Sequence, residues 1–443
     1  MPARVWQPST SAAPPCGRDA RRRRPWAASS TSAAWHESTL EIRCRDADLA
    51  SVVNMNSFRY LASELRLYQG EDALQSLGRE LDRAKSCRAV IVCGKSVANH
   101  PSLLGAATQA IGGRLVGVFG KVQAHSPSSC VEAATQMLRM TQADAVIAIG
   151  GGSAMVTARA AAIALAEAKD VAELATRMEA SGELSSPRLS APKLPQFVVP
   201  TTPTTAAVKA GSAVLDESTG RRRALFDPKT RARAVFVHPL FLESAPASLV
   251  LAASINTLTM AIEGLEAPAA HALTDADFLQ SIHLSEDVLG NFSENVQVSS
   301  CRSALMLAAI LCGRGTDHVG GGVCSALSHA CGARTGVENG LINAVLLPHV
   351  VAFNAERSRA ARGESQLAQE NGLRCEYSRV RDPLYLRRLF CDAGAPERLR
   401  DLEVPKLALD DIAGDAGEDW FLQRGPRPVN GVQELRTLLE QAW

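Results

Sequence analysis

The sequence lacks both a charge imbalance and a long apolar run. Its 47 Lys and Arg residues oppose 46 Asp and Glu residues, and the net charge is +1. A chain with this balance has no electrostatic reason to bind nucleic acid or a membrane surface. No apolar run approaches the roughly 20 residues that span a bilayer. We therefore expect no nucleic-acid partner and no membrane partner.

Paired cysteines are also missing. The 11 cysteines are an odd number, are scattered, and include no CxxC pair. This pattern suits a reducing compartment better than a disulfide-linked secreted protein. We expect residues 1–57 to form a disordered or targeting leader, because the segment is rich in Arg and lacks the apolar segment of a secretory signal. We expect a cytoplasmic protein; the alternative is a mitochondrial one, if the leader is a transit peptide.

The length of the chain predicts two domains, because 443 residues exceed what one hydrophobic core usually serves. Short apolar strands first alternate with helical stretches, which indicates a mainly parallel sheet covered on both faces. Long helical patterns follow. We expect a Rossmann-like α/β domain at 58–243 and an α-helical domain at 244–443. The predicted strands are 89–93, 115–119, 145–149 and 196–199, and the predicted helices are 71–85, 128–140, 154–168, 249–265, 303–312 and 322–331.

A glycine-rich turn follows one of these strands. The apolar run 146–149 ends at Gly150, Gly151, Gly152 and Ser153, and an Ala-rich helical stretch begins at once. Without a Cβ, the glycines let a pyrophosphate lie against the backbone, where the positive end of the helix faces its charge. Ser153 can add a hydroxyl donor. This predicts a phosphate-binding turn; the alternative is a turn that only packs the helix against the sheet.

Sequence blocks from residue 58 to the C-terminus resemble one family. The runs GGGSAMVTAR, VVPTTPTTA, SINTLTMAIEGL and ALSHACGARTGVENGLINAVLLPHVVAFNAE have the order and spacing of the iron-containing alcohol dehydrogenase family. The AHSP run at 124–127, Asn256 and the PRPV ending resemble its maleylacetate reductase branch. The resemblance implies an NAD(P)H-binding domain, a homodimer, and reduction of a carbonyl or an activated double bond in a small-molecule substrate.

The resemblance also implies a metal site, from which this chain departs. Metal-dependent members hold the cation with an Asp and a His on one helix and with two later His residues. The matching residues here are Asn256, Met260, Ser325 and Asn339. Amide, thioether and hydroxyl groups bind a hard divalent cation poorly. We expect no metal; the alternative is a cation held by other ligands, for example His318, His329 and Glu263.

Cofactor contacts are implied at the glycine turn, a Thr-rich segment, one strand end and a basic run. The residues concerned are Gly94, Lys95, Gly150, Gly151, Gly152, Ser153, Thr201, Thr202, Thr205 and Arg222. No acid stands beside Lys95 to repel a 2′-phosphate, so NADH and NADPH both stay open. The alternatives are a solvated loop for Lys95 and a solvated turn for Arg222. Val156 and Arg159 replace an Asp and a Lys of the family turn.

His329 is the candidate catalytic residue, because the resemblance places it near the nicotinamide. Its ordinary pKa lies close to neutral pH, so it can donate the proton that a reduced carbonyl oxygen needs. The alternative is a core histidine bonded to a backbone carbonyl. Lys209 can meet an acidic substrate or can be a surface lysine. We expect a metal-independent NAD(P)H-dependent reductase; the alternatives are a degenerate relative that binds a nucleotide or metabolite without turnover, and a metalloenzyme with other ligands.

Overall fold

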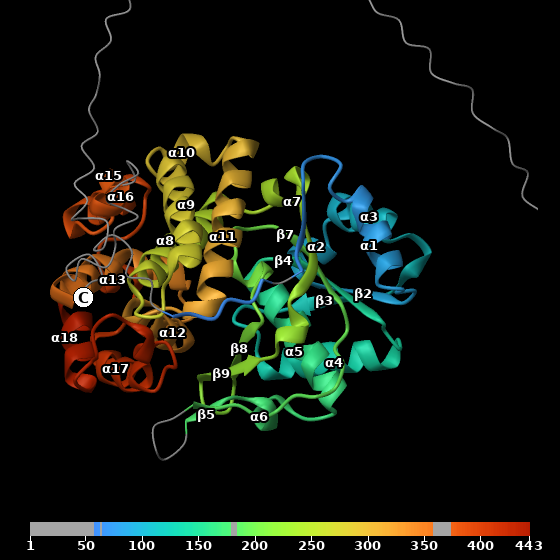
Figure 1. Ribbon diagram of the computed structural model, residues 1–443, viewed down its shortest axis with the longest axis horizontal. Coiled ribbons are helices and arrows are strands. Elements are labelled where there is room, and N and C mark those ends of the chain that lie inside the picture. Colours follow the sequence, from blue (N-terminus) through green and yellow to red (C-terminus); the bar gives the residue numbers. More distant parts are fainter. Residues whose placement is uncertain (1–56, 63, 179–183, 358–373) are drawn as a thin grey trace, which may run out of the picture. The chain divides into compact units, whose positions relative to one another are not determined.

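The computed structural model describes residues 57–62, 64–178, 184–357 and 374–443 (Figure 1). All of them belong to one compact unit, Val52–Trp443. The predicted leader lies outside the described residues, except for Ser57. As predicted, a parallel sheet with its helices comes first along the chain, drawn in blue to green in Figure 1, and a helical part follows in yellow to red.

The first part contains a sheet of six parallel strands. The strands are β1 (Arg66–Gln69), β2 (Ala89–Gly94), β3 (Leu115–Val122), β4 (Ala145–Gly150), β7 (Gln196–Pro200) and β10 (Ala232–Val237). Their order across the sheet is β1-β10-β7-β4-β2-β3. The central strands β7, β4 and β2 consist almost wholly of buried residues, because helices cover both faces of a parallel sheet. The four predicted strands are present; β1 and β10 were not predicted.

Alternate residues of the strands enter two different cores. Val90 and Val146 belong to a core that includes α4 and α5, whereas Ile91 and Ile147 belong to a core that includes α1 and α3. This follows from the period of two along a strand. The helices of the first part are α1 (Gln75–Arg83), α2 (Lys95–Ala98), α3 (Pro101–Ile111), α4 (Ser128–Met140), α5 (Gly152–Glu167), α6 (Val171–Leu174) and α7 (Pro239–Glu243).

A hairpin outside the main sheet was also not predicted. Strand β8 (Gly211–Asp216) pairs antiparallel with β9 (Arg221–Phe226). The basic run at the start of β9 favours a solvated turn by sequence alone. Pairing instead sets Arg222 opposite Leu215 and Arg223 opposite Val214, so neighbouring arginines point to opposite faces of the hairpin. The strands β5 (Arg177–Met178) and β6 (Leu184–Ser185) form a second short pair.

The second part is built from helices around one apolar core. The helices are α8 (Ala247–Glu266), α9 (Ala272–Leu289), α10 (Phe292–Asn295), α11 (Ser299–Val319), α12 (Val323–Thr335), α13 (Asn339–Asn354), α15 (Arg374–Arg379), α16 (Pro383–Asp392), α17 (Leu409–Gly417) and α18 (Val432–Ala442). Short 3-10 turns are η1 (Gly112–Arg114), η2 (Thr205–Ala207), η3 (Pro228–Thr230), η4 (Ala355–Arg357), η5 (Leu399–Leu402), η6 (Lys406–Ala408) and η7 (Leu422–Arg424).

Helix α8 runs through this core and corrects one expectation. Its mean hydropathy of 1.4 over an 18-residue window makes it long and apolar enough to cross a membrane, so the expectation that no such run exists is wrong. However, 78% of that window is buried inside the protein, where α8 packs against α9, α11 and α13. These contacts are those of a core helix.

The two parts contact each other next to the Thr-rich segment. Helix α11 packs against η2 and α7, and α12 packs against β9. A Cβ on Gly313 of α11 would lie 2.6 Å from the carbonyl oxygen of Thr205, so this close approach requires glycine. The domain boundary predicted after residue 243 falls in the connection between α7 and α8. Residues of both parts therefore meet at the sheet edge that carries the glycine turn.

Candidate functional site

The glycine-rich turn joins β4 to α5. Gly150 has a φ of 146°, a conformation open to glycine. A Cβ on Gly151 would lie 2.9 Å from Thr202 Oγ1, and a Cβ on Gly152 would lie 3.2 Å from Thr204 Oγ1. The N-terminus of α5 has no side-chain cap and no acid in its first turn. The turn therefore offers N–H donors and the positive end of a helix to an anion.

The Thr-rich segment follows the neighbouring strand β7 and lies against this turn. The Thr201 N–H donates a 2.9 Å hydrogen bond to the Gly150 carbonyl oxygen. Thr201 and Thr202 are both buried there. The hydroxyl of Thr205 points elsewhere, because its Oγ1 lies 4.0 Å from Met260 Sδ of α8. The structure thus brings Thr201 and Thr202 to the glycine turn and directs Thr205 towards the helical part.

Gly94 and Lys95 lie at the same edge of the sheet. Gly94 ends β2, which pairs with β4, and Lys95 begins the short helix α2 with an exposed side chain. Ser153 lies in the first turn of α5, and its carbonyl oxygen accepts a 3.0 Å hydrogen bond from Ser126 Oγ. Because the carboxyl ends of parallel strands share one edge, these residues and the glycine turn surround one place.

Arg159 holds the Thr-rich segment to the hairpin. Its side chain is fully buried in α5. It donates 2.5 Å hydrogen bonds to the carbonyl oxygens of Gly211 and Ala206. Burial lowers the pKa of Arg159 to about 10, since desolvation disfavours the charged form. Arg159 therefore stabilises the backbone around the turn from inside the protein.

His329 of α12 pairs with Asp419. Its Nδ1 lies 2.8 Å from Asp419 Oδ2, so the partner is a carboxylate and not the backbone carbonyl of the alternative interpretation. An ionised carboxylate only accepts, so Nδ1 carries a hydrogen and Nε2 is the position for proton exchange. The rings of Trp420 and Phe421 lie beside the imidazole, at centroid distances of 5.8 and 5.4 Å. A histidine paired with an aspartate in this way can act as a general acid or base.

His125 pairs with Arg222 across the hairpin. The Arg222 Nη2 lies 2.5 Å from His125 Nδ1, and a guanidinium only donates, so the neutral ring carries its proton on Nε2. Burial, and then the charge of Arg222, lower the pKa of His125 to about 4. His125 Nε2 is buried with no well-aligned hydrogen-bond partner among the described residues, and the backbone oxygen of Gly336 is the group that raises the pKa of His125 against these effects. Burial also lowers the pKa of Arg222 to about 10, so the solvated-turn alternative is wrong.

These two pairs are electrostatic neighbours. The charge of His329 contributes to the low pKa of His125, and the charge of Asp419 acts on Arg222. The sequence indicates His329 and Arg222 as two separate candidate residues, whereas His125 appears only as part of the AHSP run at 124–127. Sequence reasoning missed Asp419, which lies 90 residues after His329 and belongs to no motif. These residues come together only in the folded chain, where α12 packs against β9 of the hairpin and against α17, which Asp419 follows.

The four positions that the resemblance assigns to a metal lie on α8, α12 and α13. Asn256 Oδ1 accepts a 3.0 Å hydrogen bond from Asn343 Nδ2, and Asn256 Nδ2 lies 3.8 Å from Met260 Sδ. Ser325 Oγ donates a 2.5 Å hydrogen bond to a buried carboxylate of α8. Asn339 Oδ1 is buried with no partner among the described residues. These uncharged side chains do not fit a hard divalent cation.

The alternative ligand set does not come together either. His318 stacks on Tyr60, with ring centroids 4.5 Å apart. His329 pairs with Asp419, and Glu263 accepts a hydrogen bond from Ser325 Oγ of α12. Within the described ranges, no three His, Cys, Asp or Glu side chains are grouped to hold a metal. These three residues therefore do not form a metal site in that part of the chain.

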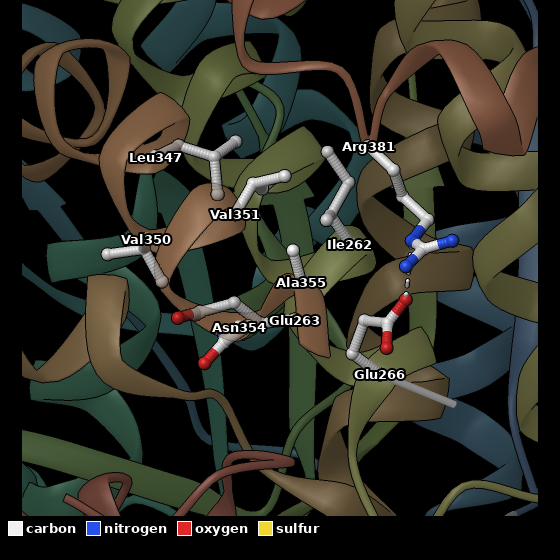
Figure 2. A pocket seen from close by; sticks show the side chains of 9 residues that line it. All are labelled: Ile262, Glu263, Glu266, Leu347, Val350, Val351, Asn354, Ala355 and Arg381. Carbon is white, nitrogen blue, oxygen red and sulfur yellow. Dashed lines mark ion pairs between the residues drawn. The ribbon is translucent and has the colours of Figure 1, made fainter. Parts of the chain in front are cut away.

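A small cavity lies between α8 and α13 (Figure 2). Leu347, Val350 and Val351 give it apolar walls, and Figure 2 shows Arg381 directed towards Glu266, with 3.3 Å between Nε and Oε1. None of the predicted cofactor or catalytic residues lines it. The cavity shares Glu263, the acceptor for Ser325 Oγ, with the surroundings of the site described above.

Comparisons with known proteins agree with this architecture. Family models match in succession: iron-containing alcohol dehydrogenase over residues 65–239, and the C-terminal part of the Fe-containing alcohol dehydrogenase family over 250–443. The NAD-dependent methanol dehydrogenase of Bacillus methanolicus is 27% identical over 331 residues, 74% of this chain and 84% of the relative. The lactaldehyde reductase of Escherichia coli K12 is 28% identical over 391 residues, 84% of this chain and 97% of the relative.

Solved structures share the fold. Maleylacetate reductase from Agrobacterium tumefaciens is 22% identical, with a TM-score of 0.70 over 88% of this chain and 99% of that one. The fold and the family matches define an oxidoreductase of the alcohol dehydrogenase type. The chain belongs to the iron-containing alcohol dehydrogenase family. This confirms the resemblance that the ordered sequence blocks carry.

Proposed function

We propose that the protein is an NAD(P)H-dependent reductase that works without a metal ion. Its substrate is the carbonyl group or activated double bond of a small, acidic molecule, reduced in the manner of a maleylacetate reductase. The observation that carries the proposal is the 2.8 Å pair of His329 and Asp419. A reductase needs a group that protonates its product, and a paired imidazole in a chain that also carries a nucleotide-type glycine turn can supply it.

The glycine turn and the strand edge hold the dinucleotide. Gly150, Gly151 and Gly152 leave room for a pyrophosphate against the backbone, and Thr201 and Thr202 line the turn. Lys95, exposed at the neighbouring strand end, can meet a 2′-phosphate, so NADH and NADPH are both candidate cofactors. When bound, the nicotinamide supplies the hydride. The relative from Bacillus methanolicus is NAD-dependent by name, which supports this class of cofactor.

His329 supplies the proton to the substrate oxygen through Nε2. Asp419 accepts the hydrogen bond from Nδ1, fixes the ring orientation and stabilises the imidazolium before transfer. The neutral ring of His125 contacts Arg222 and holds that guanidinium within electrostatic reach of Asp419. Arg222 adds a positive charge that favours an acidic substrate.

The lack of a fitting donor set supports a reaction without a metal. A metal ion would stabilise the negative charge that develops on the substrate oxygen by roughly several kcal/mol. Without the metal ion, a substrate that is already activated suits this site best. The structural likeness to maleylacetate reductase agrees with such a substrate. A homodimer in the cytoplasm stays a prediction from the resemblance and the cysteine pattern.

The test begins with fluorescence titration of the purified, metal-analysed protein with NADH and NADPH. We compare wild type with Gly151→Asp and Ser153→Asp, which set a carboxylate at the N-terminus of α5, and with the control Gly105→Asp, where nothing lies within 4 Å of a Cβ. We expect binding by wild type and the control, and at least tenfold weaker binding by the two site variants. Initial rates with lactaldehyde and maleylacetate in the presence of NADH or NADPH, and with methanol in the presence of NAD+ or NADP+, all measured in EDTA, then test turnover. A folded protein that binds neither nucleotide contradicts the proposal.

A further inference from the structure

Lys209 places a half-buried ammonium group where both parts of the chain meet. It follows the Thr-rich segment, and its Nζ lies 4.0 Å from Met260 Sδ of α8. Thr205 Oγ1 and Asn256 Nδ2 approach the same sulfur, at 4.0 and 3.8 Å. The surface-lysine interpretation is therefore wrong. The ammonium contacts Met260, and Asn256 contacts the same sulfur, so it lies beside two of the four side chains at the family's metal positions.

The Lys209 ammonium forms no direct ion pair with a carboxylate of the described residues. Among the described residues, no acidic oxygen lies within 4.0 Å of Lys209 Nζ. Asp317, whose charge reaches Lys209, is bonded to Arg231, with 2.7 Å between Oδ2 and Nε. Burial lowers the pKa of Lys209, because desolvation disfavours the charged form. A half-buried cation next to a thioether is costly unless an anion or a polarised oxygen binds to it.

We propose that the Lys209 ammonium replaces the divalent cation as the group that polarises the substrate oxygen. This inference rests on the proposed reductase function. Hydride addition to the carbonyl carbon, or to the far carbon of a double bond conjugated with it, moves an electron pair onto the carbonyl oxygen. Lys209 donates a hydrogen bond to that oxygen and keeps its proton, while His329 transfers its Nε2 proton to form the alcohol in the first case and the enol in the second. One positive charge in place of two restricts the enzyme to carbonyl groups activated by a neighbouring carboxylate or conjugated double bond.

The experiment compares Lys209→Met and Lys209→Arg with the control Lys169→Met, which removes an exposed lysine after the C-terminal end of α5. Rates are measured in EDTA with maleylacetate, whose carbonyl is activated, and with lactaldehyde, whose carbonyl is not and which should react slowly; binding is measured by NADH and NADPH fluorescence. We expect Lys209→Met to lower kcat by about 100-fold, the scale of one lost oxyanion donor, while nucleotide affinity stays within twofold. Lys209→Arg keeps the charge and retains part of kcat; the control matches wild type.

A second readout separates a chemical role from a structural one. In Lys209→Ala, added propylamine should restore kcat in proportion to its protonated concentration, which a folding defect would not allow. Wild-type turnover in EDTA with an unchanged kcat for Lys209→Met overturns the inference and leaves the reductase function intact. Wild-type activity that EDTA abolishes and Zn²⁺ or Fe²⁺ restores overturns the inference as well. Absence of nucleotide binding or of any wild-type turnover removes the reductase function itself, and the inference with it.

Discussion

Glu263 of α8 accepts a 2.5 Å hydrogen bond from Ser325 Oγ at the start of α12. Its Oε1 also accepts a 2.7 Å hydrogen bond from the Cys324 N–H. The carboxylate therefore caps the helix that carries His329. Burial raises the pKa of Glu263, but the helix N-terminus and the hydroxyl donor oppose that effect. One buried side chain thus sets the position of the proposed proton donor.

Replacing Glu263 should lower the free energy of unfolding of the protein. Glu263→Ala leaves the N–H groups at the start of α12 without their acceptor, and we expect a loss of about 2–3 kcal/mol in the free energy of unfolding. Glu263→Gln keeps one acceptor oxygen and should lose less than half as much. Urea denaturation of the three proteins measures both values. Equal losses for the two variants would show that the capping bonds contribute little.

The stability of the protein should depend on His125 in mildly acidic solution. Its pKa in the folded protein is about 4, below the ordinary value of 6.5, so the unfolded chain binds the proton more readily. The contribution is present above pH 6.5 and is lost as the pH falls towards 4. We expect urea midpoints to fall between pH 7 and pH 5, and to fall less in His125→Gln.

The control for this experiment is His283→Gln, at a partly buried histidine of α9 whose Nε2 lies 3.5 Å from Asp287 Oδ2. It should show the same pH dependence as wild type. If His125→Gln also follows the wild-type curve, the buried Nδ1 contact with Arg222 does not govern titration in this range.

The sequence predicts local structure and motif positions well, because both depend on short-range patterns. The helix 128–140 is predicted with the bounds of α4, and the glycine turn lies where the apolar run ends. The hairpin is missed because three successive arginines suggest solvent, and only cross-strand pairing buries Arg222. Asp419 could not be identified from the sequence, which offers Lys209 only as a possible contact for an acidic substrate. Each acquires its role from a residue on a distant helix, a relation that no local pattern encodes.

Asp419→Asn should reduce catalysis without unfolding the protein. The amide has the same shape, but it can present an N–H to His329 Nδ1 and favour the wrong tautomer. We expect kcat to fall by roughly tenfold or more, with unchanged nucleotide affinity, in steady-state assays with NADH. Asp392→Asn, at an exposed position of α16, is the matched control and should keep the wild-type rate. A wild-type kcat in Asp419→Asn would exclude the aspartate from the acid–base group.

Gly313→Ala should disturb the junction between α11 and the Thr-rich segment. The new methyl group would lie 2.6 Å from the Thr205 carbonyl oxygen and from Val208 Cγ2, so the segment must move. Overpacking of this kind costs about 1–3 kcal/mol. We expect a lower urea midpoint together with weaker binding of NADH, since the same segment lines the glycine turn. Gly105→Ala, with nothing within 4 Å of its Cβ, is the control and should gain roughly 0.5–1 kcal/mol from helix propensity. Weaker nucleotide binding in both variants would assign the effect to something other than the displaced Thr205 backbone.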